Sequence, residues 1–69
     1  MHKLEEFRGA AGLSVSELCR RASVSRQAYY NMLEGSDPQI LTAKRLAVAL
    51  GISLDGFYAA WRAGDDTQA

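Results

Sequence analysis

Two short helical segments meet at a tight turn in residues 14–35, SVSELCRRASVSRQAYYNMLEG. The segment SVSE at residues 14–17 has the pattern of a capping box, which predicts a helix over residues 15–22. Ser25 is a favoured N-cap and predicts a second helix over residues 26–34. Two helices joined by a turn of about three residues have the spacing of a helix-turn-helix.

The rest of the chain continues this pattern of short helices with clear ends, and no segment alternates apolar and polar residues as a strand does. The three further helices expected run from Leu4 to Ala11, ended by Gly12; from Asp37-Pro38 to Leu50, ended by Gly51; and from Leu54 to Ala63, capped by Ser53. The sequence therefore predicts an all-α fold, a compact five-helix domain over residues 1–63 whose second and third helices form the helix-turn-helix. A polar, frayed tail is expected at residues 64–69.

Apolar residues recur at helical spacing and mark the expected core. They are Leu4, Phe7 and Ala11; Val15, Leu18, Cys19, Ala22 and Val24; Tyr29 and Met32; and Ile40, Ala43, Leu46, Ala47 and Leu50. On the last expected helix, Leu54, Phe57, Tyr58 and Trp61 share one face. Cys19 is interpreted as a small core residue and His2 as a frayed terminal residue.

The composition of the 69 residues argues against several classes of protein. One cysteine cannot form an internal disulfide, and one cysteine with one histidine falls short of the usual donors of a zinc site, so no metal or cofactor is expected. No apolar run approaches the roughly 18 residues of a membrane span, and the charged N-terminus is unlike a secretory signal. Nothing resembles a nucleophile–base pair or a phosphate-binding glycine loop. We expect a cytoplasmic protein that is not an enzyme.

The expected third helix has one polar side. At about 100° per residue, Arg26, Gln27, Tyr30 and Asn31 fall within one arc, and the opposite arc is apolar. Arginine pairs with guanine and glutamine or asparagine with adenine at base edges, and the first turns of a recognition helix enter the major groove. The same residues would also suit an ordinary solvated helix face.

A series of short phrases resembles a known family. They are Ala11-Gly12-Leu13-Ser14, Glu17-Leu18, Val24-Ser25-Arg26, Glu34-Gly35, Asp37-Pro38 and ALGISLD at residues 49–55. In this order and at these spacings, from Leu4 to about Tyr58, the chain resembles the Cro/lambda-repressor type of helix-turn-helix regulators, also called Xre-like. The resemblance implies bacterial or phage origin and a transcription regulator that binds a palindromic DNA operator as a homodimer, most simply a repressor.

The chain departs from the family pattern at two positions of the helix-turn-helix. Ser23 stands where the family usually has glycine in the turn, and Val15 stands where a phosphate-binding glutamine is frequent. Because valine cannot bind a phosphate, phosphate contacts must then come from other groups. The candidates are Ser14, Arg20, Arg21, Ser25, Ser36 and Gln39, with Arg8 as a further candidate.

Four apolar or aromatic residues late in the chain remain as candidates for a dimer interface: Leu41, Val48, Tyr58 and Trp61. For Leu41 and Val48 the alternative is that they are scattered surface apolar residues, which are normal. An alternative function is a protein-interaction module or antitoxin-like partner protein that keeps the fold but has weak or no DNA binding, which zero net charge and the acidic Asp37 would suit.

Overall fold

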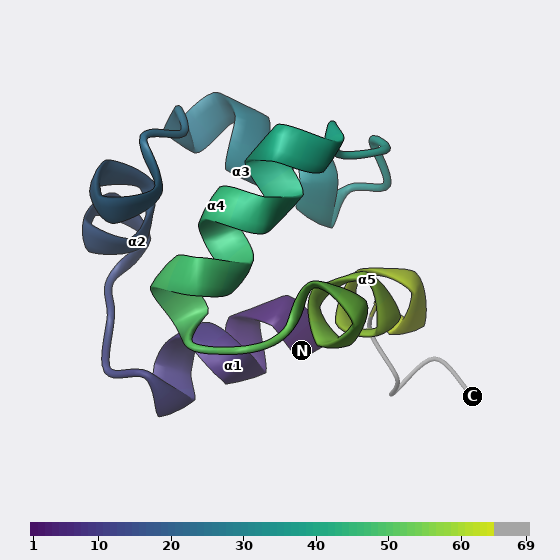
Figure 1. The fold of residues 1–69 in the computed structure, drawn as a ribbon, viewed down its shortest axis with the longest axis horizontal. Helices are drawn as coiled ribbons and strands as arrows, with labels where there is room; N and C mark the ends of the chain where they lie inside the picture. The colour runs from purple at the N-terminus through teal and green to yellow at the C-terminus, as the bar shows by residue number, and fades with distance from the viewer. Residues whose placement is uncertain (65–69) are drawn as a thin grey trace.

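The computed structural model describes residues 1–64, which contain five helices and confirm the all-α prediction. The helices are α1 (Lys3–Ala10), α2 (Val15–Ala22), α3 (Arg26–Leu33), α4 (Ile40–Leu50) and α5 (Leu54–Ala63). In Figure 1, α4 lies at the centre and the other helices are arranged around it. It packs against α2 and α5, while α1 packs against α5 and α2 against α3. The expected tail beyond residue 64 lies outside the described residues.

The core draws residues from all five helices, and most of the predicted core positions are confirmed. The buried side chains are Leu4, Leu13, Leu18, Cys19, Ala22, Tyr29, Met32, Ala43, Leu46, Ala47, Leu50, Phe57 and Ala60. Burial raises the pKa of the Cys19 thiol, as expected for a core cysteine rather than a reactive one.

The core prediction is wrong at three residues, Phe7, Ala11 and Ile40, which are exposed. Ile40 is 64 % exposed because it is the first residue of α4, and a helical side chain points toward the N-terminal end of its own helix and so into solvent here. Phe7 is 36 % exposed, and beside it on α5 lie Gly56, Ala59 and Ala63, which are too small to cover the ring. Of the expected first-helix face, only Leu4 is fully buried.

The beginning of α4 also differs from the prediction. Gln39, not Asp37, is the N-cap residue, and it makes no side-chain capping hydrogen bond. Pro38 therefore lies before the helix rather than in its first turn. Residues 36–39 are non-helical and carry the chain from the end of α3 to α4. Because proline favours an extended residue before it, the Asp37-Pro38 pair suits such a connection as well as a helix start.

The predicted serine caps are confirmed at three helices. The hydroxyl of Ser14 accepts a hydrogen bond from the Glu17 amide at 3.1 Å, and that of Ser25 accepts one from the Ala28 amide at 3.1 Å. The hydroxyl of Ser53 does the same for α5. At α1 the cap is unexpected, because the Nδ1 atom of His2 accepts the Leu4 amide at 3.0 Å. His2 is therefore an ordered N-cap and not a frayed end.

The two ends of the described chain meet. The Lys3 amide donates to the carbonyl of Gly64 at 2.8 Å, which joins the first turn of α1 to the residue that follows α5. The sequence pattern assigns Gly64 to the frayed tail. The hydrogen bond instead makes it part of the packed domain.

The turn of the helix-turn-helix holds a non-glycine residue in the left-handed conformation. Ser23 has φ 57° and ψ 43°, its amide donates to Arg20, and the Val24 amide donates to Cys19. This pair of hydrogen bonds is the Schellman motif. The same motif closes α1, α3 and α4, where the left-handed residue is a glycine: Gly12, Gly35 and Gly51. Ser23 therefore carries strain that glycine would relieve.

Ser23→Gly should raise the free energy of unfolding by about 0.5–1 kcal/mol, because relief of the left-handed strain exceeds the added freedom of the unfolded chain. Chemical denaturation measures the change. Ser36→Gly is the matched control. Its φ is not positive, since Ser23 is the one non-glycine residue with positive φ among residues 1–64, so this variant should be slightly less stable. Equal destabilisation by both changes would contradict the assignment of strain to Ser23.

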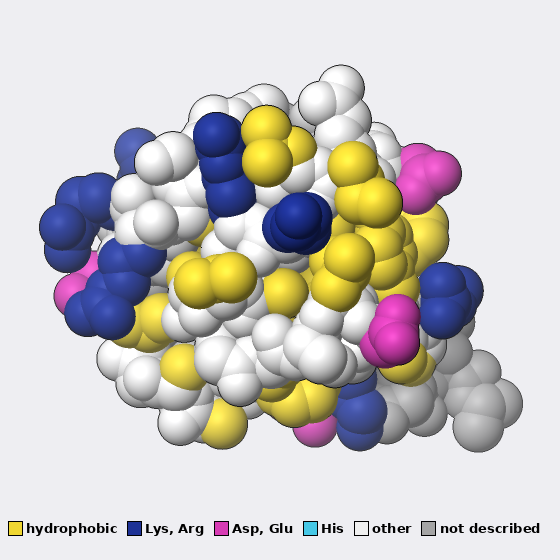
Figure 2. All heavy atoms as spheres, in the orientation of Figure 1, with side chains coloured by type: hydrophobic (Ala, Val, Ile, Leu, Met, Phe, Trp, Pro, Cys, Tyr) yellow, Lys and Arg dark blue, Asp and Glu magenta, His cyan; other side chains and the backbone are white. Residues whose placement is uncertain are grey.

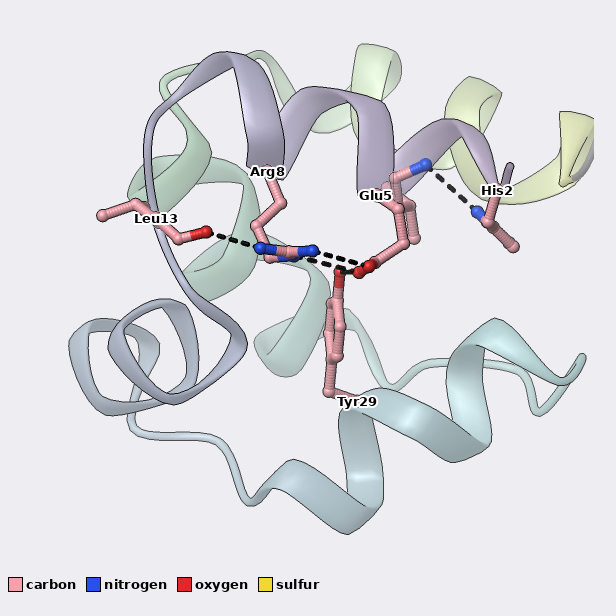
Figure 3. A network of polar contacts seen from close by, with 6 residues as sticks. His2, Glu5, Arg8, Leu13 and Tyr29 are labelled. Atoms are coloured by element: carbon pink, nitrogen blue, oxygen red, sulfur yellow. Dashed lines mark hydrogen bonds and ion pairs between the residues drawn. The ribbon is translucent and has the colours of Figure 1, made fainter.

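A polar network joins α1 to α3 and to the loop after α1 (Figure 3). The Glu5 carboxylate accepts two hydrogen bonds from Arg8, at 2.7 and 3.1 Å, and a third from the Tyr29 hydroxyl, whose side chain points from α3 toward α1. Arg8 also donates to the carbonyl of Leu13 at 2.6 Å. The Tyr29 side chain is fully buried, so the carboxylate satisfies a hydroxyl that the core would otherwise leave unpaired.

The network shifts the protonation of its members. The hydrogen bonds from Arg8, with a smaller effect of Tyr29, lower the pKa of Glu5 despite its partial burial. Burial, then the bond to Glu5, raises the pKa of Tyr29 well above its usual value, so the hydroxyl keeps its proton and donates. Glu5 therefore stabilises the fold in its ionised form.

Glu5→Gln should lower the free energy of unfolding by about 1–2 kcal/mol at pH 7, because the neutral amide loses the charge-assisted bonds. Since the pKa of Glu5 is lowered in the fold, its contribution is complete above the unfolded value of 4.5 and is lost as pH falls through the folded value. The difference in the free energy of unfolding between wild type and Glu5→Gln should therefore shrink below about pH 4.5. Urea denaturation at several pH values measures it.

Glu6→Gln is the control for this experiment. Glu6 is 45 % exposed and pairs with Lys3 at 3.7 Å, so its loss should change stability by less than about 0.5 kcal/mol. A difference between wild type and Glu5→Gln that is constant from pH 7 to pH 3 would show that the charge of Glu5 does not contribute.

Candidate nucleic-acid interface

The recognition-helix candidate α3 is held by its apolar side and exposed on the other. Tyr29 and Met32 are buried in the core, and Ser25 caps the N-terminus. The four predicted base-contacting residues, Arg26, Gln27, Tyr30 and Asn31, are all exposed. These four side chains therefore form one continuous exposed face that carries a guanidinium group, two amides and a phenol.

Three of these side chains are oriented by neighbours. The Gln27 Nε2 atom donates to Asn31 Oδ1 at 2.9 Å, one helical turn further on. The Tyr30 ring lies edge-on to the ring of Tyr29, with centroids 6.0 Å apart. Arg26 has a weak contact with the Ser16 hydroxyl, at 3.5 Å, which leaves its guanidinium free to move toward another acceptor.

The predicted phosphate-contacting residues lie on α2, at the start of α3 and in the connection from α3 to α4. Ser14 and Ser25 begin α2 and α3, and each hydroxyl uses its oxygen as a cap acceptor while its hydrogen stays free to donate. Arg20 is 73 % exposed with Glu17 at 3.9 Å, and Arg21 is exposed. Both arginines carry a positive charge that can pair with a nearby DNA phosphate.

The start of α4 adds a third group. Ser36 and Gln39 line a shallow depression together with Ala28 and Asn31 of α3. Gln39 does not cap α4 with its side chain, so the first amides of this helix have no capping side chain and point toward the N-terminal end. Such amides suit an anion.

Arg8 is excluded as a phosphate contact in this arrangement. Its guanidinium is engaged by both Glu5 oxygens and by Leu13, and moving it to a phosphate would break the network of Figure 3. The pair of Glu5 and Arg8 has the i,i+3 spacing of a helix, but no sequence signal showed the link to Tyr29, which lies 24 residues from Glu5.

The four predicted interface residues fall into two different environments. Leu41 and Val48 of α4 are 53 % and 80 % exposed, with Arg21, Lys44 and Arg45 beside them. Figure 2 shows hydrophobic and cationic side chains intermixed on the face of the molecule that α4 crosses. Their exposure is compatible with a partner contact.

Tyr58 and Trp61 of α5 are half-buried against the core. The indole N–H of Trp61 donates to the carbonyl of Met32 at 3.0 Å, which fastens α5 to α3. The core of the domain therefore covers most of both rings and leaves only part of each for a partner. The signal was present in the sequence, since both residues share a helix face with Leu54 and Phe57.

Two further properties concern the described residues. None of the helices in residues 1–64 has the length and apolar character to cross a lipid bilayer. Within the same residues, no three His, Cys, Asp or Glu side chains are grouped so that they could hold a metal ion.

Comparison with known proteins agrees with this geometry. A family model described as helix-turn-helix matches residues 4–57, which extend from α1 into α5. No curated protein and no solved structure matches the chain significantly.

Proposed function

The chain belongs to the helix-turn-helix family of Cro/C1 type, whose members are DNA-binding transcription regulators, and we propose that it represses transcription as a homodimer on a palindromic operator. The exposed face of α3 carries this proposal. Its side chains supply the donors and acceptors that base edges require. They project from a helix whose other side is fixed in the core, as direct readout requires.

The proposed phosphate contacts frame α3. Ser14 and Ser25 donate at the starts of α2 and α3, and Ser36 and Gln39 act with the amides at the start of α4. Arg20 and Arg21 add charge at the end of α2. These groups lie on both sides of the base-reading face in the chain, so they would position α3 in the groove without reading sequence.

Charge placement matters here because the net charge is zero. A protein with few phosphate-directed cations has low non-specific affinity, since that affinity comes from neutralised phosphates and released counterions. Val15 at the start of α2 adds no polar contact. We infer that this regulator depends on base contacts more than on bulk attraction.

One α3 helix can read only a few base pairs, so a second copy would be needed to mark a unique site. Two copies related by a two-fold axis read the two halves of a palindrome about 34 Å apart, one turn of DNA. Leu41, Val48, Tyr58 and Trp61 are the proposed contact residues. Most of the surface that they offer comes from Leu41 and Val48.

A second candidate function is a protein-interaction module on the same fold, as in an antitoxin-like partner protein. The exposed Leu41 and Val48 favour it, together with Asp37 close to the start of α4. The two functions differ in salt dependence. DNA binding loses affinity steeply with salt, and a contact through apolar side chains does not.

Arg20→Ala and Arg21→Ala should each weaken binding to all DNA sequences alike and reduce the slope of log affinity against log salt by about one unit. Arg26→Ala should instead cost about 1–3 kcal/mol against the preferred site and relax the preference at one base pair. Fluorescence anisotropy of labelled duplexes at several salt concentrations measures both effects.

Arg62→Ala is the control, because Arg62 is an exposed arginine in the last turn of α5 that lies beside the C-terminal end of α3 and not beside the N-terminal turns proposed to enter the groove. It should leave the salt slope unchanged. If wild type bound no duplex at low salt, DNA binding and the proposed repressor function would both be refuted.

The dimer contact is tested by the double variant Leu41→Ser, Val48→Ser, which should raise the dimer dissociation constant at least tenfold without loss of folding, because both residues are exposed. If a two-fold contact forms here, Arg21, Lys44 and Arg45 of the two copies approach one another. Dimerisation should then strengthen with salt, which screens like charges.

Ile40→Ser is the matched control, since Ile40 is equally apolar and 64 % exposed but does not line the α4 patch with Leu41 and Val48. Sedimentation velocity gives the dissociation constants. A double variant that dimerises as well as wild type would remove Leu41 and Val48 from the interface.

A further inference from the structure

The two amides of the α3 face are joined to each other. Gln27 and Asn31 are four residues apart and lie on the same side of the helix. The Nε2 atom of Gln27 donates to Oδ1 of Asn31 at 2.9 Å, and both side chains are exposed. The pair is therefore held by its own hydrogen bond and not by burial.

This hydrogen bond leaves Gln27 with a defined free edge. One hydrogen of its amide group is used, while the second hydrogen and the oxygen Oε1 remain free. A donor beside an acceptor is the complement of adenine in the major groove, where N7 accepts and the N6 amino group donates. Gln27 can therefore bind an adenine through two hydrogen bonds without releasing Asn31.

Asn31 is in a different position. Its oxygen already accepts from Gln27, which leaves one lone pair of that oxygen for any further contact. The amide hydrogens of Asn31 remain as donors. The two amides are therefore not equivalent, although their residue types suggest the same role.

We propose that Gln27 and Asn31 form one reading unit, in which Gln27 binds a single adenine and Asn31 is a positioning residue that holds the Gln27 amide. The proposal rests on the proposed DNA-binding function. A free glutamine side chain loses rotamer freedom when it binds. Asn31 restricts that freedom before DNA arrives, so removing its acceptor weakens the adenine contact that Gln27 makes.

The experiment selects binding sites from a pool of randomised DNA duplexes and compares the base preferences of four variants with those of wild type. Gln27→Ala should lose an adenine preference at one position, an effect of roughly 10-fold to 100-fold in affinity. Asn31→Leu has no acceptor and should weaken the preference at that same position. Other positions should keep their preferences.

Asn31→Asp provides the rescue. A carboxylate keeps the acceptor for Gln27 but repels DNA phosphates, so this variant should bind all duplexes more weakly and retain the adenine preference. Gln39→Leu removes an amide from a proposed phosphate contact outside α3, so it should weaken binding to all duplexes alike and alter no single base preference. Thermal unfolding of all variants should match wild type, because these side chains are exposed.

Three results would overturn the proposal in distinguishable ways. If Asn31→Leu kept the full adenine preference, Asn31 would not be a positioning residue, and DNA recognition by α3 would stand. If Asn31→Leu and Gln27→Ala lost preferences at different base pairs, each amide would read its own base. If wild type enriched no sequence from the pool, the proposed function itself would fail together with the reading unit.

Discussion

An eight-residue helix is not stable by itself in water, and α1, α2 and α3 each have eight residues. The face proposed to read DNA is therefore only as well placed as the contacts behind α3. Tyr29 provides the most specific of these contacts, because its ring fills the core and its hydroxyl binds the Glu5 carboxylate on α1. Trp61 holds the other end of α3 through Met32. The orientation of the recognition helix thus depends on residues that never meet DNA.

The features that the sequence predicted well are governed by local chemistry. The Ser14, Ser25 and Ser53 caps each join groups three residues apart. The exposed side of α3 follows from helical periodicity, because its polar residues recur at the spacing of one helix face. Helical periodicity alone is therefore enough to predict which side chains of α3 are exposed.

The features that were missed depend on partners far apart in the sequence, or on residues that suit two different local conformations. The Glu5–Tyr29 and Trp61–Met32 contacts span 24 and 29 residues, and no spacing rule pairs such residues. At Asp37-Pro38 the same two residues suit a helix start or an extended connection, and the path from α3 to α4 decided between them. The link between Gln27 and Asn31 was allowed by their spacing, but which amide donates could not be deduced from it.

The hydrogen bond between Lys3 and Gly64 brings residues from opposite ends of the described chain into direct contact. A short peptide could then join these two points, and the backbone could be opened in the connection of residues 36–39 instead. Such a circular permutant would keep all five helices of residues 1–64 and the contacts between them. Its new termini would lie beside the proposed phosphate-binding start of α4. The contact between Lys3 and Gly64 would thus allow the same five helices to be connected in another order along the chain.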